Sequence, residues 1–290
     1  MRKRFHTIAL IGKYQSAEVR ALLLKLAHLL RERNLTPLLD TDTARNIGHT
    51  HLLSTDLVQI GQQADLAIIV GGDGTMLNIA RQLSGSNVPL LGINQGRLGF
   101  LTDISAKQTD KVVNAILDGE YDIERRFLLD VTIKRGRHKL YHGCALNDVT
   151  LNRGSSGRLI EYEIEVDGHY VYCQRSDGVV VATPTGSTAY ALSAGGPILH
   201  PSLSAVAIVP ICPHTLTDRP IVINSAAHIR ILLNSGDGAV VHVDGQIHLD
   251  VVDGDCLFIH RSRHMVTFLH PKGTNHYDTL REKLHWGQKL

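Results

Sequence analysis

The chain has 290 residues, of which 43% are apolar and 20% charged, and this length is enough for two domains that each bury a core. The formal net charge of +2 is too small to indicate a nucleic-acid-binding protein, and no apolar stretch approaches the ~20 residues that a membrane helix needs. The four cysteines stand singly, which is typical of reduced thiols, and the first apolar run ends at Lys13, too early for a signal peptide. We therefore expect a cytoplasmic protein without nucleic-acid or membrane partners.

Strand and helix patterns alternate over the first part of the chain. Short apolar runs predict strands at 8–11, 35–39, 66–70 and 88–93. Helical periodicity predicts helices at 16–33, around 50–63, at 75–83 and at 107–117. Ser16 is the expected cap of the first helix. Strands separated by helices indicate a parallel sheet with helices on its faces, so we expect an α/β fold in which residues 1–124 form a Rossmann-like domain.

From about residue 125 the pattern changes to strands joined by tight turns. Strand-like runs occur at 127–134, 139–151, 159–166 and 170–174. Asp167-Gly168 is a strong hairpin signal, and Asp244-Gly245 and Asp253-Gly254 mark turns in a second strand-rich run. We expect residues 125–270 to form a β-rich, sandwich-like domain and residues 271–290 to form a tail that packs back on the fold.

The turn Gly71-Gly72-Asp73-Gly74 joins a buried strand to a helix. Glycines let backbone amides approach a ligand, and a helix N-terminus favours anions, so the turn is suited to phosphate. Asp73 is itself an anion and an unusual neighbour for phosphate. It either caps the helix or takes part in chemistry. Neither G-x-x-x-x-G-K-[ST] nor G-x-G-x-x-G after the first strand is present, so any nucleotide chemistry here uses another cradle.

A second glycine-containing turn, GINQGRLGFLTD at residues 92–103, follows the next predicted strand. Open α/β folds bind ligands at this edge of the sheet, but we interpret the stretch as a loop packed by Leu98, Phe100 and Leu101. A third stretch, residues 175–197, places Asp177-Gly178 before a valine-rich strand and the run Thr183–Thr188 before a short helix. Such a turn either binds hydroxyls and phosphates or simply starts the helix.

Seventeen histidines raise the question of a metal site. The pairs His138/His142 and His260/His264 have a spacing that suits zinc on a helix, but both lie in strand-like sequence without a third ligand. We therefore predict no protein metal site.

Taken together, these stretches resemble one family, the NAD kinases, which transfer the γ-phosphate of ATP to the 2′-hydroxyl of the adenosine ribose of NAD and so make NADP. The resemblance implies an α/β nucleotide-binding domain followed by a β-rich dinucleotide-binding domain with the site between them, and a homo-oligomer, dimer or tetramer. The blocks that carry it occur in order along most of the chain, at 71–75, 92–94, 96–101, 147–148, 183–190, 193–197, 218–220 and 244–246. The family often has Asn-Glu where this chain has Asn147-Asp148, so the shorter acid reaches its ligand directly or through water.

The resemblance also implies roles for individual residues. Asp73 is the implied catalytic residue, which orients and deprotonates the ribose hydroxyl; such a base typically contributes ~10²–10⁴ in rate. Mg²⁺ is expected with ATP, whose β- and γ-oxygens need a cation, and no dedicated protein cage is required. Arg175 has two possible neighbours, a phosphate or the nicotinamide end. The implied nucleotide-binding residues are Gly71, Gly72, Gly74, Asn147, Asp148, Arg158, Arg175, Asp177, Thr188, Ala189, Tyr190, Ala191, Leu192, Ser193 and Gln246.

Two alternatives stay open on the sequence alone. Diacylglycerol-type lipid kinases and sugar-phosphate kinases of the phosphofructokinase type also use a Gly-Gly-Asp-Gly turn, but the lipid kinases usually follow it with Gly-Asn-Asp-Phe, where this chain has Gly96–Phe100. A non-catalytic dinucleotide sensor would keep the pocket but would not need a base at Asp73.

Overall fold

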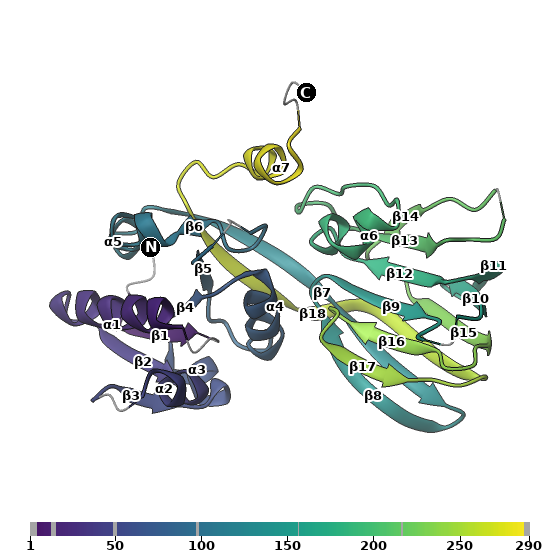
Figure 1. Cartoon of the computed structure of the whole chain (residues 1–290), viewed down its shortest axis with the longest axis horizontal. Coiled ribbons are helices and arrows are strands. Elements are labelled where there is room, and N and C mark those ends of the chain that lie inside the picture. Colours follow the sequence, from purple (N-terminus) through teal and green to yellow (C-terminus); the bar gives the residue numbers. More distant parts are fainter. Residues whose placement is uncertain are drawn as a thin grey trace. The chain divides into compact units, whose positions relative to one another are not determined.

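The computed structural model describes residues 5–12, 16–48, 51–96, 99–155, 157–215 and 217–286, and it divides into two units (Figure 1). Unit 1 comprises residues 1–125 and 266–290, and unit 2 is the continuous stretch 126–265. Strands β7 (Tyr121–Arg135) and β18 (Asp255–Pro271) each run through a boundary between the units. In the sequence, unit 2 is therefore an insertion within unit 1.

Unit 1 is built on a parallel sheet with the strand order β18-β5-β4-β1-β2-β3, and Figure 1 shows helices packed around its strands. Its central strands are apolar and buried because helices cover the sheet. The chain places β2 and β3 on one side of β1 and then β4 and β5 on the other, so the topological switch point lies between β1 and β4. The remaining strand bounds are β1 (Thr7–Gly12), β2 (Thr36–Asp40), β3 (Leu53–Thr55), β4 (Leu66–Val70), β5 (Leu90–Asn94) and β6 (Ile104–Ser105).

The helices of unit 1 begin at polar caps. Ser16 accepts hydrogen bonds from the backbone N–H groups of Glu18 and Val19, as predicted. The predicted helix around 50–63 is wrong in extent: Leu53–Thr55 is a strand, and the helix begins after Asp56, whose carboxylate accepts from Gln59 N–H at 2.8 Å. None of the helices in the described ranges is long and apolar enough to span a membrane. The helices are α1 (Ala17–Glu32), α2 (Thr41–Ile47), α3 (Leu57–Gln63), α4 (Asp73–Gln82), the 3₁₀-helix η1 (Ala106–Gln108), α5 (Thr109–Leu117) and α7 (His276–Leu284).

Unit 2 is a sandwich of antiparallel sheets. One sheet contains β11-β10-β15-β18 with β7 and β8, and the other has the order β14-β13-β12-β9-β16-β17. The hairpin signal at Asp167-Gly168 is confirmed: these residues join β10 to β11 with φ of 52° and 77°, the left-handed values that a type I′ turn needs. The predicted single strand at 139–151 is in fact two strands, β8 and β9, separated by a bend at Leu146–Asn147. The strands are β8 (His138–Ala145), β9 (Asp148–Asn152), β10 (Ile160–Val166), β11 (His169–Ser176), β12 (Gly178–Ala182), β13 (Ala205–Ile211), β14 (Ile221–Asn224), β15 (Ile229–Ser235), β16 (Val240–Val243) and β17 (Ile247–Asp250), with the 3₁₀-helix η2 (Gly186–Thr188) and the short helix α6 (Tyr190–Ser193) after β12.

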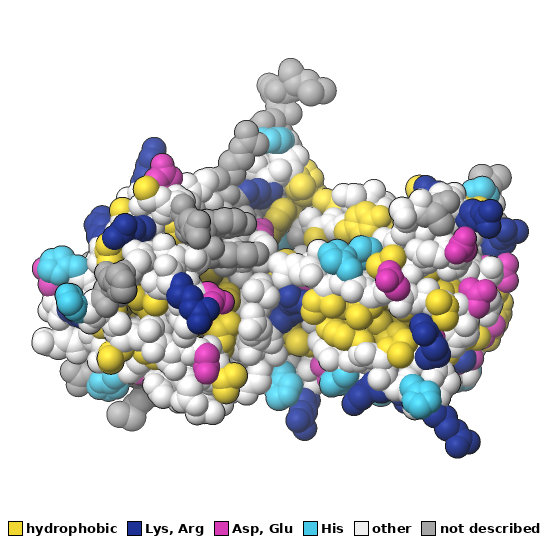
Figure 2. Space-filling view, turned by 60° about the horizontal axis from the view of Figure 1, so that its bottom comes forward, with side chains coloured by type: hydrophobic (Ala, Val, Ile, Leu, Met, Phe, Trp, Pro, Cys, Tyr) yellow, Lys and Arg dark blue, Asp and Glu magenta, His cyan; other side chains and the backbone are white. Residues whose placement is uncertain are grey.

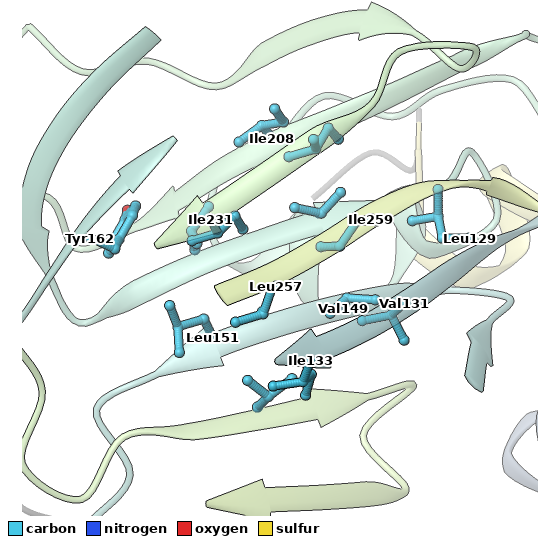
Figure 3. Packing of buried hydrophobic residues seen from close by; sticks show 14 of the residues in the cluster. Leu129, Val131, Ile133, Val149, Leu151, Tyr162, Ile208, Ile231, Leu257 and Ile259 are labelled. Atoms are coloured by element: carbon cyan, nitrogen blue, oxygen red, sulfur yellow. The ribbon is translucent and has the colours of Figure 1, made fainter. Parts of the chain in front are cut away.

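The core of unit 2 consists of the apolar side chains that both sheets direct inward (Figure 3). Val131 and Ile231 come from the first sheet, and Leu151 and Ile208 from the second, and all are almost completely buried. A two-layer sandwich requires apolar side chains of this kind on the inner face of each sheet. Both parts of the predicted fold class, a parallel α/β domain followed by a β-rich sandwich, are confirmed.

Candidate functional site

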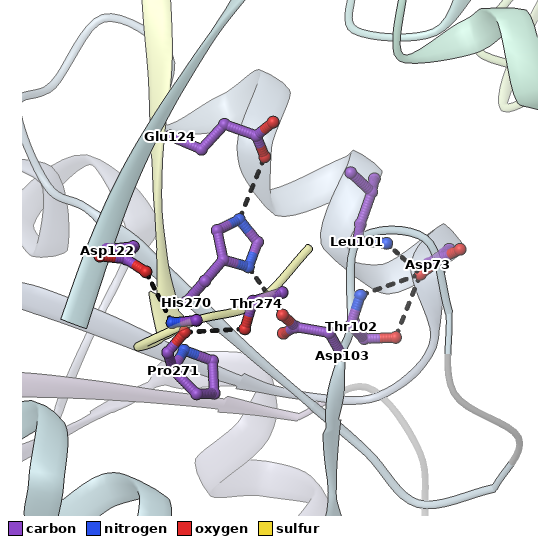
Figure 4. A network of polar contacts seen from close by, with 10 residues as sticks. Asp73, Leu101, Thr102, Asp103, Asp122, Glu124, His270, Pro271 and Thr274 are labelled. Carbon is purple, nitrogen blue, oxygen red and sulfur yellow. Dashed lines mark hydrogen bonds and ion pairs between the residues drawn. The ribbon is translucent and has the colours of Figure 1, made fainter. Parts of the chain in front are cut away.

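The carboxylate of Asp73 is held by the loop that follows β5. It accepts hydrogen bonds from the backbone N–H groups of Phe100, Leu101 and Thr102 at 2.8, 3.0 and 3.2 Å, and from the Thr102 hydroxyl at 3.1 Å. Figure 4 shows the backbone nitrogens of Leu101 and Thr102 and the Thr102 hydroxyl linked to this carboxylate. Asp73 is the first residue of α4, but the cap residue is Gly72, and no side chain caps the helix. Of the two interpretations of Asp73, the structure therefore excludes the helix cap.

The two oxygens of Asp73 have unequal surroundings. Oδ1 accepts from Leu101 and from both the N–H and the hydroxyl of Thr102, whereas within the described ranges Oδ2 accepts only from Phe100 N–H. A carboxylate has about four acceptor positions, two on each oxygen. One acceptor position on Oδ2 is thus left for another donor, and the side chain is only half buried.

Close approach of the loop to Asp73 depends on a glycine. A Cβ added at Gly99 would lie 1.9 Å from Asp73 Oδ1 and 2.5 Å from Thr102 Oγ1, so any other residue would displace the carboxylate or the loop. The loop is also tied to β5, because Asn94 Nδ2 donates to Thr102 Oγ1 at 2.8 Å. Leu101 is buried, in keeping with the apolar packing we expected, and Leu98 lies outside the described residues. The loop therefore packs and also orients an acid.

A cavity of about 360 Å³ opens beside this turn, at the carboxyl ends of β1 and β2. Gly12 and Asp40 line it from the strand ends, Thr43 lines it from α2, and Thr75 and Asn78 line it from α4. This is the switch point of the sheet, where open α/β folds bind their ligands. Unit 1 thus has a cavity next to the Asp73 turn, in the position where open α/β folds bind nucleotides.

In unit 2, a second acid organises the bend between β8 and β9. The Asp244 carboxylate accepts from the backbone N–H groups of Leu146, Asn147 and Asp148 at 3.0, 2.7 and 3.1 Å. From the other side, Thr183 N–H donates to Asn147 O at 2.9 Å. Two segments that are far away in the sequence, at Asp244 and at Thr183, therefore fix the bend that carries Asn147 and Asp148.

Asp148 is an ionisable group in a buried position, with 5% of its surface exposed. Burial raises its pKa from 3.8 to about 7, and the nearby charge of Asp244 contributes to the increase. The pKa of the Tyr190 phenol is also raised, by burial and by Cys212, Asp177 and Asp148. Asp148 and Asp177 thus both lie close enough to Tyr190 to affect the ionisation of its phenol.

The other expected binding residues fall into two groups. The turn after β12 carries Thr188, Ala189, Tyr190, Ala191, Leu192 and Ser193, of which only Ala191 is fully buried. The two arginines lie instead on exposed surface, Arg158 at 3.9 Å from Asp237 and Arg175 at 3.9 Å from Glu161.

The glycines of the Asp73 turn and the two polar residues Asp177 and Gln246 complete the set. Gly71 N–H donates to Ile93 O within the sheet, whereas the position of a Cβ on Gly72 is open and Gly74 is exposed. Asp177 forms an ion pair with Arg153 at 2.9 Å, and Gln246 follows Asp244 in the turn between β16 and β17.

Several residues that shape these sites were not expected from the sequence. Phe100 lies 27 positions from Asp73, to which its amide donates, and Asp244 lies 98 positions from Leu146, from whose amide it accepts. No local sequence pattern indicates contacts over such separations. Asp244-Gly245 was expected as a turn and as part of the block 244–246 that carries the resemblance, but no role was predicted for the Asp244 carboxylate. No local pattern indicates His270 either, whose Nδ1 lies 2.7 Å from Asp103 at the end of the loop that holds Asp73.

The charged side chains on one face and the two histidine pairs singled out in the sequence can be located in the structure. Figure 2 shows Lys and Arg side chains interspersed with Asp and Glu on the face that it presents, with histidines at several separate places. His142 pairs with the Thr132 hydroxyl at 3.1 Å, and His260 with the carbonyl of Arg261 at 3.0 Å. Among the described residues, no group of three or more His, Cys, Asp or Glu side chains is arranged to hold a metal ion.

A parallel α/β unit with an acid-bearing glycine turn at its switch point, joined to a sandwich with a hydroxyl-rich turn, defines a nucleotide-dependent phosphotransferase. Comparison with known proteins identifies the family. Residues 9–121 match the ATP-NAD kinase N-terminal domain, and residues 146–270 match the ATP-NAD kinase C-terminal domain. The chain belongs to the ATP-NAD kinase family and is a phosphotransferase with an alcohol group as acceptor.

Individual relatives support this assignment along the whole chain. NAD kinase from Thiobacillus denitrificans is 51% identical over 286 residues, which cover 99% of each chain. NAD kinase from Aromatoleum aromaticum is 50% identical over 287 residues, 99% of this chain and 96% of the relative. These matches set aside the lipid kinases and sugar-phosphate kinases that we had kept as alternatives.

Two solved structures share the fold. Yeast NADH kinase complexed with NADH superposes with a TM-score of 0.90 at 26% identity, covering all of this chain and 90% of the other. An NAD kinase from Archaeoglobus fulgidus in complex with ATP superposes with a TM-score of 0.75 at 26% identity, covering 96% and 98%.

Proposed function

We propose that the chain transfers the γ-phosphate of ATP to the 2′-hydroxyl of the adenosine ribose of NAD, and that Asp73 orients and deprotonates this hydroxyl. A ribose hydroxyl is a poor nucleophile at neutral pH, so transfer depends on positioning and on a group that accepts its proton. The 2′-oxygen forms a bond to the γ-phosphorus of ATP while the bond between that phosphorus and the β,γ-bridging oxygen breaks, which releases ADP. The hydroxyl proton passes to the Asp73 carboxylate.

The observation that supports this role is the asymmetry of the Asp73 carboxylate. Three donors on Oδ1 fix the orientation of the side chain, while Oδ2 keeps an acceptor position for a hydroxyl. A side chain held in this way keeps its orientation without the substrate, and preorganisation of this kind favours the transition state.

We propose that unit 2 supplies the dinucleotide pocket. The ionised Asp148 side chain and the amide of Asn147 are suited to ribose hydroxyls, and the turn after β12 offers backbone amides and small side chains to the phosphates. Asp177 and Gln246 join this pocket, and Arg158 and Arg175 reach the phosphates from its exposed rim. In this scheme residues 1–124 form the nucleotide-binding domain, residues 125–270 the dinucleotide-binding domain, and residues 271–290 pack back on the fold.

Mg²⁺ would neutralise the β- and γ-oxygens of ATP. No three potential ligands gather among the described residues, and Asp73 already accepts four hydrogen bonds, so these residues offer no preformed cage. Mg²⁺ commonly binds through substrate phosphates and water instead, and we therefore propose that it arrives with ATP. We further propose that the enzyme works in the cytoplasm as a dimer or tetramer, which light scattering would test.

The experiment is direct. Purified protein is incubated with Mg-ATP and NAD, and NADP is measured with an NADP-specific dehydrogenase. NAD binding without any NADP would overturn the proposal in favour of a non-catalytic sensor. Repeating the assay with polyphosphate and with NADH defines the donor and acceptor range.

The role of Asp73 is tested by Asp73→Asn. Turnover should fall by ~10²–10⁴ because the general base is lost. The variant also loses one acceptor for a backbone N–H, which costs about 1–3 kcal/mol of stability, so folding is checked by thermal melting. Asp56→Asn is the matched control, because this carboxylate also binds a backbone N–H but caps α3. Near-wild-type turnover of Asp73→Asn would show that Asp73 is not the base.

A further inference from the structure

His270 lies between two carboxylates in unit 1. Its Nδ1 is 2.7 Å from Asp103 Oδ2, and its Nε2 is 3.1 Å from Glu124 Oε2 (Figure 4). All three side chains are largely shielded, with exposed fractions of 13%, 14% and 29% for His270, Asp103 and Glu124. The three residues come from β18, from the loop before β6 and from β7, so the histidine joins three separate segments.

One of these segments is the loop that holds Asp73. Asp103 directly follows Thr102, whose N–H and hydroxyl both donate to Asp73 Oδ1. Asn94 of β5 donates to the Thr102 hydroxyl, and the His270–Asp103 contact fixes the next residue of the loop to β18. The position of Asp73 therefore depends on His270 through only two intervening residues.

The double contact requires a protonated imidazole. A neutral ring has one N–H and one lone pair, so it can donate to only one carboxylate, and its lone pair would face the other. Burial alone lowers the pKa of His270, but the hydrogen bonds to Asp103 and Glu124 outweigh burial and raise it to about 9. The Phe268 ring stacks on the His270 ring, with centroids 6.3 Å apart, and the carboxylate of Asp122 accepts from Gly273 N–H at 2.9 Å.

We propose that His270 is a positioning residue for phosphoryl transfer: as an imidazolium bridging Asp103 and Glu124, it holds the 99–103 loop and thereby the Asp73 carboxylate. The proposal rests on the role proposed for Asp73. It assigns His270 no contact with substrate, so loss of the histidine should lower kcat while the KM for NAD changes little.

The first test compares His270→Gln with Asp122→Asn. Glutamine cannot bridge two carboxylates as a cation. Asp122→Asn instead neutralises a nearby carboxylate that accepts from Gly273 N–H, just beyond the end of β18, and it leaves the histidine bridge in place. His270→Gln should lower kcat by about 10–100-fold, the scale of a catalytic group misplaced by ~1 Å. Asp122→Asn should leave kcat within about twofold of wild type. Equal kcat values for His270→Gln and wild type would overturn the proposal.

A double-mutant cycle separates positioning from a general structural effect. If His270 acts through Asp73, adding His270→Gln to Asp73→Asn should reduce kcat no further, because the oriented base is already absent. Two reductions that simply multiply would show that His270 acts independently of Asp73 and would refute the proposal.

A measurement on the wild-type protein removes the dependence on variants. Hydrogen exchange at the amides of Phe100, Leu101 and Thr102 is followed from pH 7 to pH 10 and corrected for intrinsic rates. Exchange should accelerate at least ~10-fold as His270 loses its proton near pH 9, and these amides should exchange fast at all pH values in His270→Gln. Unchanged protection would contradict the proposal. This readout also distinguishes the two hypotheses, because it tests the histidine bridge even if Asp73→Asn proves active.

Discussion

Replacing Asp148 by asparagine should stabilise the protein at high pH and weaken its binding of NAD. The carboxyl of Asp148 is buried, and its pKa is raised from 3.8 to about 7 by burial and by Asp244. A raised acid pKa means that the folded state holds this proton more strongly than the unfolded state does. The associated stability is fully present below pH 3.8 and is lost as the pH rises toward about 7.

The size of the effect follows from the same two pKa values. Linkage gives a loss of about 2–3 kcal/mol between pH 5 and pH 9 from this one group, most of it below pH 7. Asp148→Asn removes the titration, so its advantage over wild type should grow by this amount across the range. NAD affinity should fall by about 10–100-fold, because a charge-assisted hydrogen bond contributes about 1.5–3 kcal/mol.

Urea unfolding at pH 5, 7 and 9 measures the stability term, and titration calorimetry with NAD measures the affinity. Asp250→Asn, an exposed carboxylate in the same unit, is the control and should leave both quantities unchanged. Parallel stability curves for wild type and Asp148→Asn from pH 5 to pH 9 would show that the carboxyl titrates normally, and the reasoning from burial would fail.

Three other substitutions test the geometry of the two sites. Gly99→Ala places a Cβ 1.9 Å from Asp73 Oδ1, so turnover should fall at least ~10-fold in the NADP assay while NAD binding is retained. Gly186→Ala places a Cβ 2.1 Å from Asn147 O, so the bend must move, and calorimetry should show NAD binding weakened by at least ~10-fold. Asp244→Asn leaves a buried backbone N–H of that bend without an acceptor, which should cost about 1–3 kcal/mol in urea unfolding and should weaken NAD binding as well.

Matched controls exist for these changes. Gly85→Ala adds a Cβ where no atom lies within 4 Å, so turnover and NAD binding should stay at wild-type values. Asp253→Asn neutralises a comparable carboxylate, which accepts from Gly236 N–H at 2.8 Å, and should leave NAD binding unaffected. Retention of full NAD affinity in Gly186→Ala or Asp244→Asn would contradict the assigned role of the 146–148 bend.

Local signals were enough to predict most elements of the fold. The apolar run at Leu66–Val70, the cap at Ser16 and the Asp167-Gly168 turn each specify a structure within a few residues, and each is present as predicted. Errors arose where a cap competes with an apolar pattern. Around 50–63 the periodicity suggested one helix, but Asp56 starts the helix late and residues 53–55 pair with β2.

Less of the candidate sites than of the fold could be predicted from the sequence. Asp73 stood out because a carboxylate among glycines is unusual, but its position left a helix cap and a chemical role both open, and the role as a base followed from the resemblance to the NAD kinases. The groups that orient it could not be found, since backbone amides carry no residue-type signal and His270 lies 167 positions from its partner Asp103. Long-range partners of this kind require the fold before they can be recognised.

The order of the units along the chain has a consequence for biosynthesis. Unit 2 is complete by residue 265, whereas unit 1 still needs Phe268 of β18, which pairs with Leu90 of β5, and Leu269, which joins its core. During translation the inserted sandwich can therefore close first, while the parallel sheet that began the chain waits for its last strand. Synthesis of unit 1 thus begins before that of unit 2, but unit 1 can complete its fold only afterwards.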